Sequence, residues 1–127
     1  KIASGGEMSR IMLAIKKVLA EVDNVAVLIF DEIDTGISGK AANAVADKLS
    51  SISKNHQVIC ISHLASIAAN ADYNYFISKK VVGERTSTSI KQLNEQETLE
   101  EIARISAGDI NEVSMQYALK LRSKKAS

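Results

Sequence analysis

Two adjacent carboxylates, Asp31 and Glu32, directly follow an unbroken apolar run, residues 25–30, in this chain of 127 residues. Such a run, rich in Val and Ile, is typical of a strand buried on both faces. Because burying an unpaired carboxylate is costly, we expect both acids to lie at the strand tip and to meet a partner. A divalent cation with a nucleotide phosphate is one such partner, since Mg²⁺ is commonly held by one or two carboxylates and phosphate oxygens. The alternative is a buried strand that ends in a solvated acidic turn.

A glycine pair near the start of the sequence is the second feature that could bind an anion. Gly5 and Gly6 lie between Ser4 and Glu7, which have the spacing of a capping box, and apolar residues at helical spacing follow from Met8. Glycines let the backbone approach a ligand closely, and the N–H groups at a helix start favour phosphate. A simple capped helix after a turn is the alternative interpretation.

The imidazole of His63 follows a second predicted buried strand, residues 57–62. A helix is predicted between the two strands, from about Gly39 to Ser53, with Ser38 as its cap. The order strand, helix, strand implies a right-handed crossover between parallel strands, so both strands end at the same edge of a sheet. Open α/β sheets bind ligands at that edge, and we expect the imidazole and the acid pair to converge there.

The rest of the chain is predicted to complete one α/β unit over residues 1–127, with a β-hairpin and two helices after the parallel strands. The predicted elements are a short helix at 64–71, strands at 72–78 and 86–93 joined around Val82–Glu84, and helices at 95–107 and 112–125. The basic side chains of the hairpin, Lys79, Lys80, Arg85 and Lys91, are interpreted as a solvated edge rather than a nucleic-acid surface.

Composition is that of an ordinary globular domain. Hydrophobic residues make up 46% of the chain and charged residues 24%, and the formal net charge of +1 provides no global field for nucleic acid or membranes. The single cysteine, Cys60, lies in an apolar run and is predicted to be a buried thiol, so a disulfide framework is excluded. We expect a cytoplasmic protein without a membrane span, and a chain that starts at Lys1 suggests a fragment of a longer polypeptide.

Three motifs in this order resemble the C-terminal lobe of an ABC-type ATPase head, and the resemblance covers nearly the whole chain. Ser4–Glu7 resembles the signature motif, the run into Asp31-Glu32 resembles a Walker B strand, and His63 resembles the switch histidine. ABC transporters usually carry Gln at the position of Glu7 and Pro-Thr after the acids. Glu7 and Ile33-Asp34 are instead similar to SMC-like chromosome and repair ATPases.

The resemblance implies a role for each motif residue. Asp31 would hold Mg²⁺ through water, Glu32 would be the general base for the attacking water, and His63 would contact the γ-phosphate of ATP. The signature residues Ser4, Gly5, Gly6 and Glu7 would bind nucleotide held mainly by a second head. The segment Thr35–Ser38 aligns with the loop that crosses the dimer interface, although transporters often have Asp where Ser38 stands.

No Walker A pattern surrounds any of the six glycines, so the chain is expected to supply half of an active site. The resemblance places the phosphate-binding loop upstream, beyond a coiled coil. It implies an ATPase in the full-length protein that acts in DNA double-strand-break repair and is associated with the nucleoid. The expected partners are the chain's own N-terminal Walker A lobe, a second head in a homodimer, and DNA through the full-length protein. The isolated chain is expected to be inactive and to expose a sheet edge and an apolar surface.

Two other functions remain open at this stage. One is the nucleotide-binding subunit of an ABC transporter, which Glu7 and Ile33-Asp34 disfavour. The other is a non-catalytic interaction module, which the intact Asp31, Glu32 and His63 disfavour.

Overall fold

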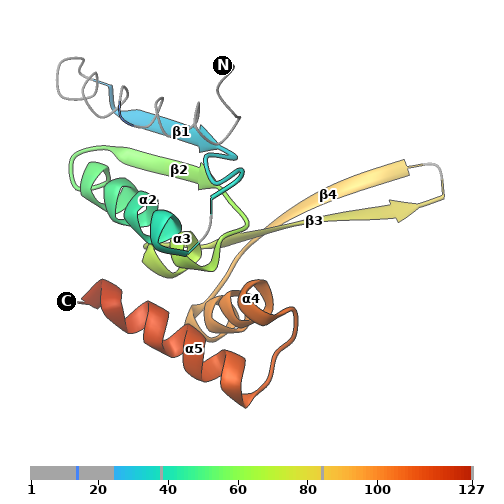
Figure 1. The fold of residues 1–127 in the computed structure, drawn as a ribbon. Helices are drawn as coiled ribbons and strands as arrows, with labels where there is room; N and C mark the ends of the chain where they lie inside the picture. The colour runs from blue at the N-terminus through green and yellow to red at the C-terminus, as the bar shows by residue number, and fades with distance from the viewer. Residues whose placement is uncertain (1–13, 15–24, 38, 84, 127) are drawn as a thin grey trace.

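A computed structural model describes residues 14, 25–37, 39–83 and 85–126 of the chain (Figure 1). In chain order the elements are β1 (Val27–Asp31), α2 (Gly39–Ile52), β2 (Gln57–Ile61), α3 (Ala65–Asn70), β3 (Tyr75–Val82), β4 (Arg85–Gln92), α4 (Glu95–Ala107), α5 (Glu112–Ser123) and the 3-10 turn η1 (Lys124–Ala126). The predicted α/β class is confirmed. The predicted signature loop and Ser38 lie outside the described residues, and so does the helix predicted after that loop, apart from Ala14, which is helical.

Strands β1 and β2 pair in parallel, as the crossover argument predicts, with Val27 opposite Gln57 and Asp31 opposite Ile61. The prediction of burial on both faces is wrong for the part of the chain described here. Leu28 and Phe30 point into the core, whereas Val27 and Ile29 are 42% and 58% exposed. A strand's side chains alternate between its two faces, and among these elements a helix covers only one face of the pair.

The covered face of the β1–β2 sheet packs on α2. Helix α2 buries the residues that its spacing predicts: Ala42, Val45, Ala46, Leu49 and Ile52. Val45, Ala46, Leu49 and Ile52 join Leu28, Phe30, Ile33, Ile37 and Ile67 in the first hydrophobic cluster. This cluster holds the carboxyl ends of both strands on a rigid support.

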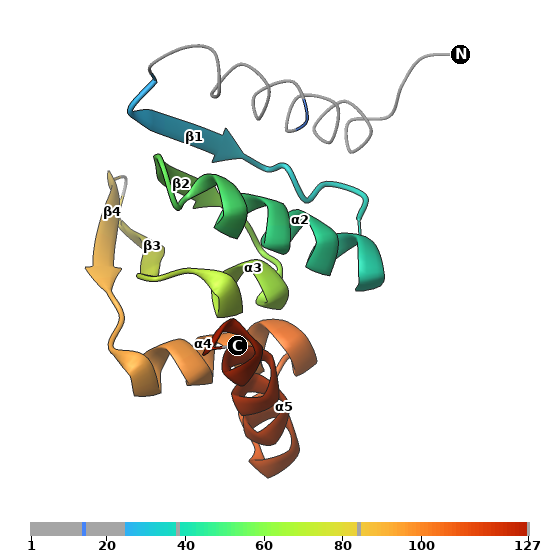
Figure 2. The ribbon, with the colours of Figure 1, turned by 90° about the vertical axis from the view of Figure 1, so that its left-hand side faces the viewer.

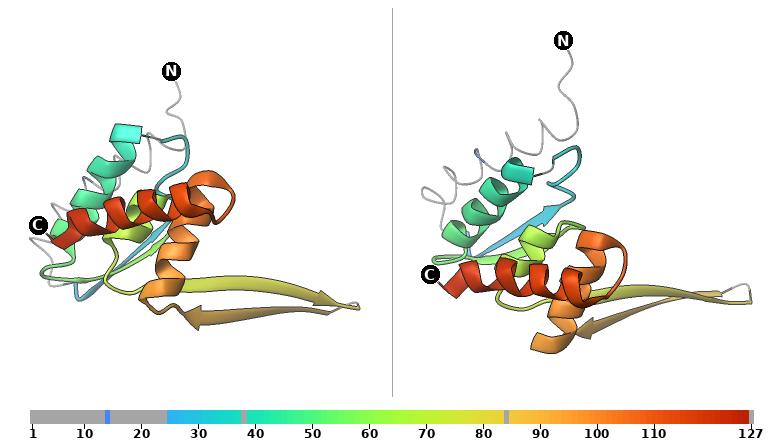
Figure 3. Two further views of the ribbon diagram at one scale, coloured as in Figure 1. Left: turned by 90° about the horizontal axis from the view of Figure 1, so that it is seen from below. Right: turned by 60° about the horizontal axis from the view of Figure 1, so that its bottom comes forward.

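Strands β3 and β4 form an antiparallel hairpin that extends away from the rest of the molecule (Figures 1 and 3). The hairpin differs from its prediction mainly at β3, which begins at Tyr75 rather than Asp72 and continues to Val82, whereas β4 is shifted by one residue from the predicted 86–93. Gly83 takes a positive φ of 63° at the turn, which a glycine adopts without strain. Lys91 at the base of the hairpin pairs with Glu97 of α4.

Helices α4 and α5 form a second hydrophobic cluster with α3, which lies between them and α2 (Figure 2). Helix α4 has the predicted bounds because Asn94 caps its start in a capping box and Gly108 ends it at a φ of 83°. Helix α5 ends at Ser123, two residues before its prediction, and continues as the 3-10 turn. Among the described residues, no helix is both long enough and apolar enough to span a bilayer.

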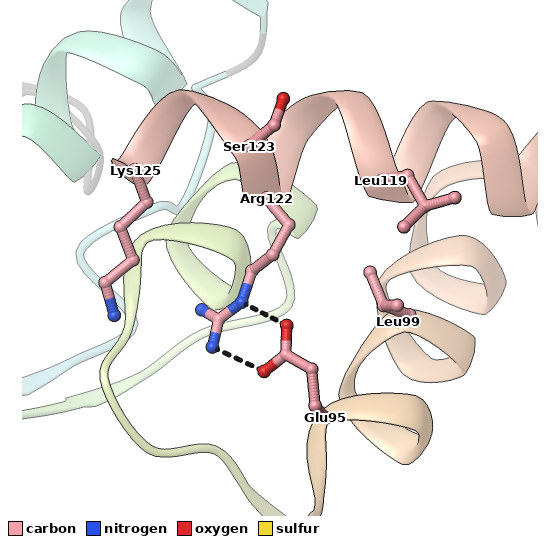
Figure 4. A pocket seen from close by; sticks show the side chains of 6 residues that line it. All are labelled: Glu95, Leu99, Leu119, Arg122, Ser123 and Lys125. Carbon is pink, nitrogen blue, oxygen red and sulfur yellow. Dashed lines mark hydrogen bonds and ion pairs between the residues drawn. The ribbon is translucent and has the colours of Figure 1, made fainter. Parts of the chain in front are cut away.

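Arg122 of α5 joins three helices (Figure 4). Its guanidinium donates two 3.0 Å hydrogen bonds to the Glu95 carboxylate at the start of α4. It also donates to the carbonyl oxygens of Ala69 and Ala71, at 2.9 Å and 2.6 Å, where α3 ends. Lys125 adds a 2.7 Å bond to the Ala71 carbonyl. Two cations thus satisfy carbonyls that a helix end leaves unpaired.

We expect Arg122→Ala to lower the free energy of unfolding by about 2–3 kcal/mol, because it removes the donor to the part-buried Ala69 carbonyl and one of the two donors to the Ala71 carbonyl. Urea denaturation followed by circular dichroism measures the change.

Glu95→Gln is the matched control for that substitution. It removes only the ion pair, whose carboxylate is 63% exposed, and should cost less than about 1 kcal/mol. The guanidinium lowers the pKa of Glu95, so the ion pair's contribution is present above the unfolded pKa and is lost as the pH falls. Equal losses in the two variants would show that the carbonyl contacts contribute nothing.

Candidate functional site at the strand ends

The acid pair lies where β1 ends, and its backbone is strained. Asp31 and Glu32 are both exposed. Glu32 has a φ of 51°, in the left-handed region that non-glycine residues rarely adopt. Its N–H still donates to the Ile61 carbonyl at 3.1 Å, and its own carbonyl accepts from the N–H and hydroxyl of Thr35 at 3.3 Å and 3.0 Å. The chain therefore leaves the sheet in a tight turn with the Glu32 carboxylate in solvent.

Buried side chains anchor this turn. Ile33 and Ile37 enter the first hydrophobic cluster, whereas Thr35 and Gly36 between them are exposed. Asp34 is also fully buried, with 0% of its surface exposed. The turn thus alternates between residues that fix it to the core and residues that face solvent.

The Asp34 carboxylate connects this turn to the end of β2. Its Oδ2 accepts hydrogen bonds from the Ser62 hydroxyl at 2.6 Å and from the His63 backbone N–H at 3.0 Å. The same oxygen lies 3.2 Å from Nδ1 of the His63 ring. Its Oδ1 is buried and has no hydrogen-bond partner among the described residues. A buried acid thus links two loops that are about thirty positions apart in the sequence.

The structure confirms that the acid pair and the imidazole follow parallel strands to one edge of the sheet. His63 stands there with 75% of its side chain exposed. It borders a groove of about 740 Å³ lined by residues from α2, α3, α4 and α5, among them Asn43, Ser66 and Tyr117. Of the other predicted site residues, Ser4, Gly5, Gly6, Glu7 and Ser38 lie outside the described residues.

Sequence reasoning missed Asp34 as a member of the site. A third acid in a loop is ordinarily solvated, and here it is the most buried charged group of the strand ends. Its flanking residues held a signal, because Ile33 and Ile37 are apolar positions on either side of a polar turn. The other signal was Ser62, directly before His63, because a serine hydroxyl can donate a hydrogen bond to a buried carboxylate.

Metal ligation at this edge would have to rely on few protein groups. No cluster of three or more His, Cys, Asp or Glu side chains able to hold a metal occurs among the described residues. The exposed Asp31 carboxylate fits a cation that completes its shell with water and phosphate oxygens, as Mg²⁺ usually does.

The pKa of Cys60 reflects both its burial and the acidic side chains near this edge. Its thiol is partly buried against the first cluster, and Cys60 lies opposite Phe30 in the paired strands. Burial, followed by the charges of Asp34 and Asp31, raises the pKa of Cys60 from its ordinary 9.0 to about 12. The prediction of a buried thiol is correct only in part, because Cys60 is partly buried.

A glycine at position 32 should relieve the strain at that residue. We expect Glu32→Gly to be more stable than Glu32→Ala by about 1–2 kcal/mol. Glycine has no Cβ and adopts a φ of 51° without strain, whereas the Cβ of alanine clashes with the backbone there. Both variants remove the same carboxylate, so denaturation midpoints compare the backbone effect alone. An alanine variant as stable as the glycine variant would contradict the strained geometry.

Thiol labelling should be slow in the folded chain. With the pKa of Cys60 at about 12, the thiolate fraction at pH 8 is about a thousandfold below that of an ordinary thiol. The labelling rate with iodoacetamide should rise steeply only as the pH approaches 12. The same chain in urea is the control and should react like free cysteine; equal rates in both states would overturn the prediction.

Comparison with known proteins identifies a family. No protein-family model matches the chain. The chain is 49% identical over 122 residues to the DNA repair protein RecN of Halalkalibacterium halodurans, across 95% of this chain and 22% of that protein. It is 53% identical over 109 residues to RecN of Treponema pallidum, across 86% of this chain and 19% of that protein. RecN of Bacillus subtilis is 44% identical over 122 residues, across 95% of this chain and 21% of that protein.

A solved structure supports the fold independently. It comes from work on the structural biochemistry of ATP-driven dimerization and DNA-stimulated activation of SMC ATPases. The TM-score is 0.62 at 24% sequence identity, across 82% of this chain and 62% of that one. The chain spans about a fifth of the length of the curated relatives it matches. Over the segment that it spans, the chain is homologous to the DNA repair protein RecN.

Proposed function

We propose that this chain is the C-terminal lobe of an ATP-hydrolysing head in an SMC-like protein of DNA double-strand-break repair. The observation that carries the proposal is the parallel pairing of β1 with β2, which brings the acid pair and His63 to one edge. The RecN relatives are described as DNA repair proteins, and the structural neighbour as an SMC ATPase. These relatives favour a repair ATPase over a transporter subunit.

Phosphoryl transfer needs charge neutralisation and a positioned water more than covalent chemistry. In the proposed site Glu32 accepts the proton of the attacking water, and its strained backbone holds the carboxylate clear of the sheet. His63 contacts the γ-phosphate from the neighbouring strand. Asp31 would hold Mg²⁺ through water, and the bound ion would neutralise phosphate charge.

The remaining contacts of the proposed site come from outside this lobe. A second head in a homodimer would present its own Ser4, Gly5, Gly6 and Glu7 to the nucleotide, with Ser38 in the loop that crosses between heads. The ATP itself would be held by the Walker A lobe of the same polypeptide.

Among the described residues no helix covers the second face of the β1–β2 sheet, and this face suits the docking of the Walker A lobe. Val27 and Ile29 of β1 are exposed there with Ile59 and Ile61 of β2, at 44% and 46%. Within the described residues each of the two strands also has one unpaired edge. Apolar side chains beside an open strand edge are typical of a surface that another element covers. DNA contact through the full-length protein and a cytoplasmic location on the nucleoid complete the proposal.

In the full-length protein, we expect Glu32→Gln to reduce ATP hydrolysis by about 10²–10⁴-fold while nucleotide binding stays within a few-fold. Phosphate release measures the first quantity and fluorescent nucleotide titration the second. Asp47→Asn, an exposed acid on α2, is the matched control and should hydrolyse ATP at the wild-type rate. The isolated chain should show no turnover that depends on Glu32. Wild-type hydrolysis in Glu32→Gln would disprove the proposal.

A further inference from the structure

The ring of His63 is exposed to solvent, and a contact with Asp34 restrains it. Its side chain is 75% exposed, and Asp34 Oδ2, at 3.2 Å from Nδ1, is the charged group that meets it among the described residues. A side chain this exposed would ordinarily sample several rotamers. This contact limits that freedom, because the backbone N–H and the ring Nδ1 of His63 both face Asp34 Oδ2.

We propose that Asp34 is a positioning residue that keeps a proton on Nδ1 of His63 and turns Nε2 toward the γ-phosphate. A carboxylate oxygen only accepts hydrogen bonds, so the nitrogen that faces it is the one that carries the proton in a neutral imidazole. The inference rests on the proposed function for the identity of the group that Nε2 meets. The orientation of the ring and its tautomer do not depend on that function.

The buried charge of Asp34 makes this restraint strong. A carboxylate with 0% exposure loses its hydration, and its Oδ1 has no partner among the described residues. In such a surrounding the local dielectric constant is low, so a hydrogen bond to Oδ2 is electrostatically stronger than the same bond in water.

Ser62 holds the backbone on both sides of the imidazole. Its hydroxyl donates to Asp34 Oδ2 at 2.6 Å and accepts from the Leu64 N–H at 3.0 Å. The residues before and after His63 are thus fixed by the same small network. The ring can then be aimed by one further contact, the one between Nδ1 and Asp34.

The arrangement has a chemical consequence at Nε2. Phosphate oxygens, like carboxylate oxygens, accept hydrogen bonds. To donate to a γ-phosphate oxygen as well as to Asp34, the imidazole needs a proton on each of its two ring nitrogens. A cation there stabilises the charge on the transferred phosphoryl group. In other acid–histidine pairs a carboxylate likewise orients the imidazole and stabilises its protonated form.

Nitrogen-15 NMR of the histidine rings in this chain tests the proposal without ATP hydrolysis. At a pH where the rings are neutral, His63 should show the Nδ1–H tautomer in the wild type. Asp34→Ala should shift it toward Nε2–H, the form that free histidine favours. Ser62→Ala, which leaves the Nδ1 contact in place, should not.

His56 provides the internal control, because its Nδ1 lies 2.6 Å from the Val25 carbonyl and must donate to it. The His56 spectrum should stay unchanged in every folded variant, and its loss would reveal unfolding. A wild-type His63 in the Nε2–H form would overturn the proposal even if Asp34→Ala does not fold. An unchanged His63 tautomer in a folded Asp34→Ala chain would overturn it as well.

Kinetics of the full-length protein separate this inference from the proposed function. Asp34→Asn should lower kcat about tenfold or more with little change in KM, because it removes the charge that orients the imidazole. The same substitution should have little effect in a His63→Ala background, since its effect passes through that ring. An equal loss of kcat in both backgrounds would refute the positioning role. If His63→Ala itself hydrolyses ATP normally, the proposed role of His63 fails, whereas the tautomer result stands.

Discussion

The contact between the Asp34 carboxylate and the Ser62–His63 segment is the interaction on which the site depends. It joins the loop after β1 to the loop after β2, so the two strand ends cannot separate without breaking the hydrogen bonds of the buried Asp34 side chain. Breaking such a contact is far costlier than breaking a surface ion pair, since the remaining groups are desolvated and unpaired. The parallel register sets the edge of the sheet at which the polar groups meet. The buried acid determines how they are oriented there.

Apolar contacts explain why the strand ends that carry the site are rigidly held while neighbouring surfaces are exposed to solvent. Ile33 and Ile37 carry the β1 loop into the first cluster, and α2 covers one face of the strands. The opposite face keeps Val27 and Ile29 exposed, and both faces of the hairpin are solvated along β4. A well-packed core beside a sheet face that the described residues leave exposed is consistent with a segment that spans about a fifth of its relatives.

Most elements were predictable because their signals are local. The buried face of α2 follows from helical spacing, and α4 is bounded by its own cap residues, Asn94 and Gly108. Burial on one face of β1 was not predictable, since an apolar run looks the same whether one or two layers cover it. The burial of Asp34 depends on Ser62, which lies far along the chain, so no local pattern contains it. The roles of Asp31, Glu32 and His63 remain predictions.

Helix α3 couples the two halves of the molecule. It has only six residues, no side-chain cap at Leu64, and contacts in both hydrophobic clusters. A helix this short is unstable in isolation, so it persists only while both clusters hold it. Because Arg122 closes its end from α5, the C-terminal helices and the strand ends should unfold as one cooperative unit. Loosening the distant end of the chain would thereby disturb the support directly after His63.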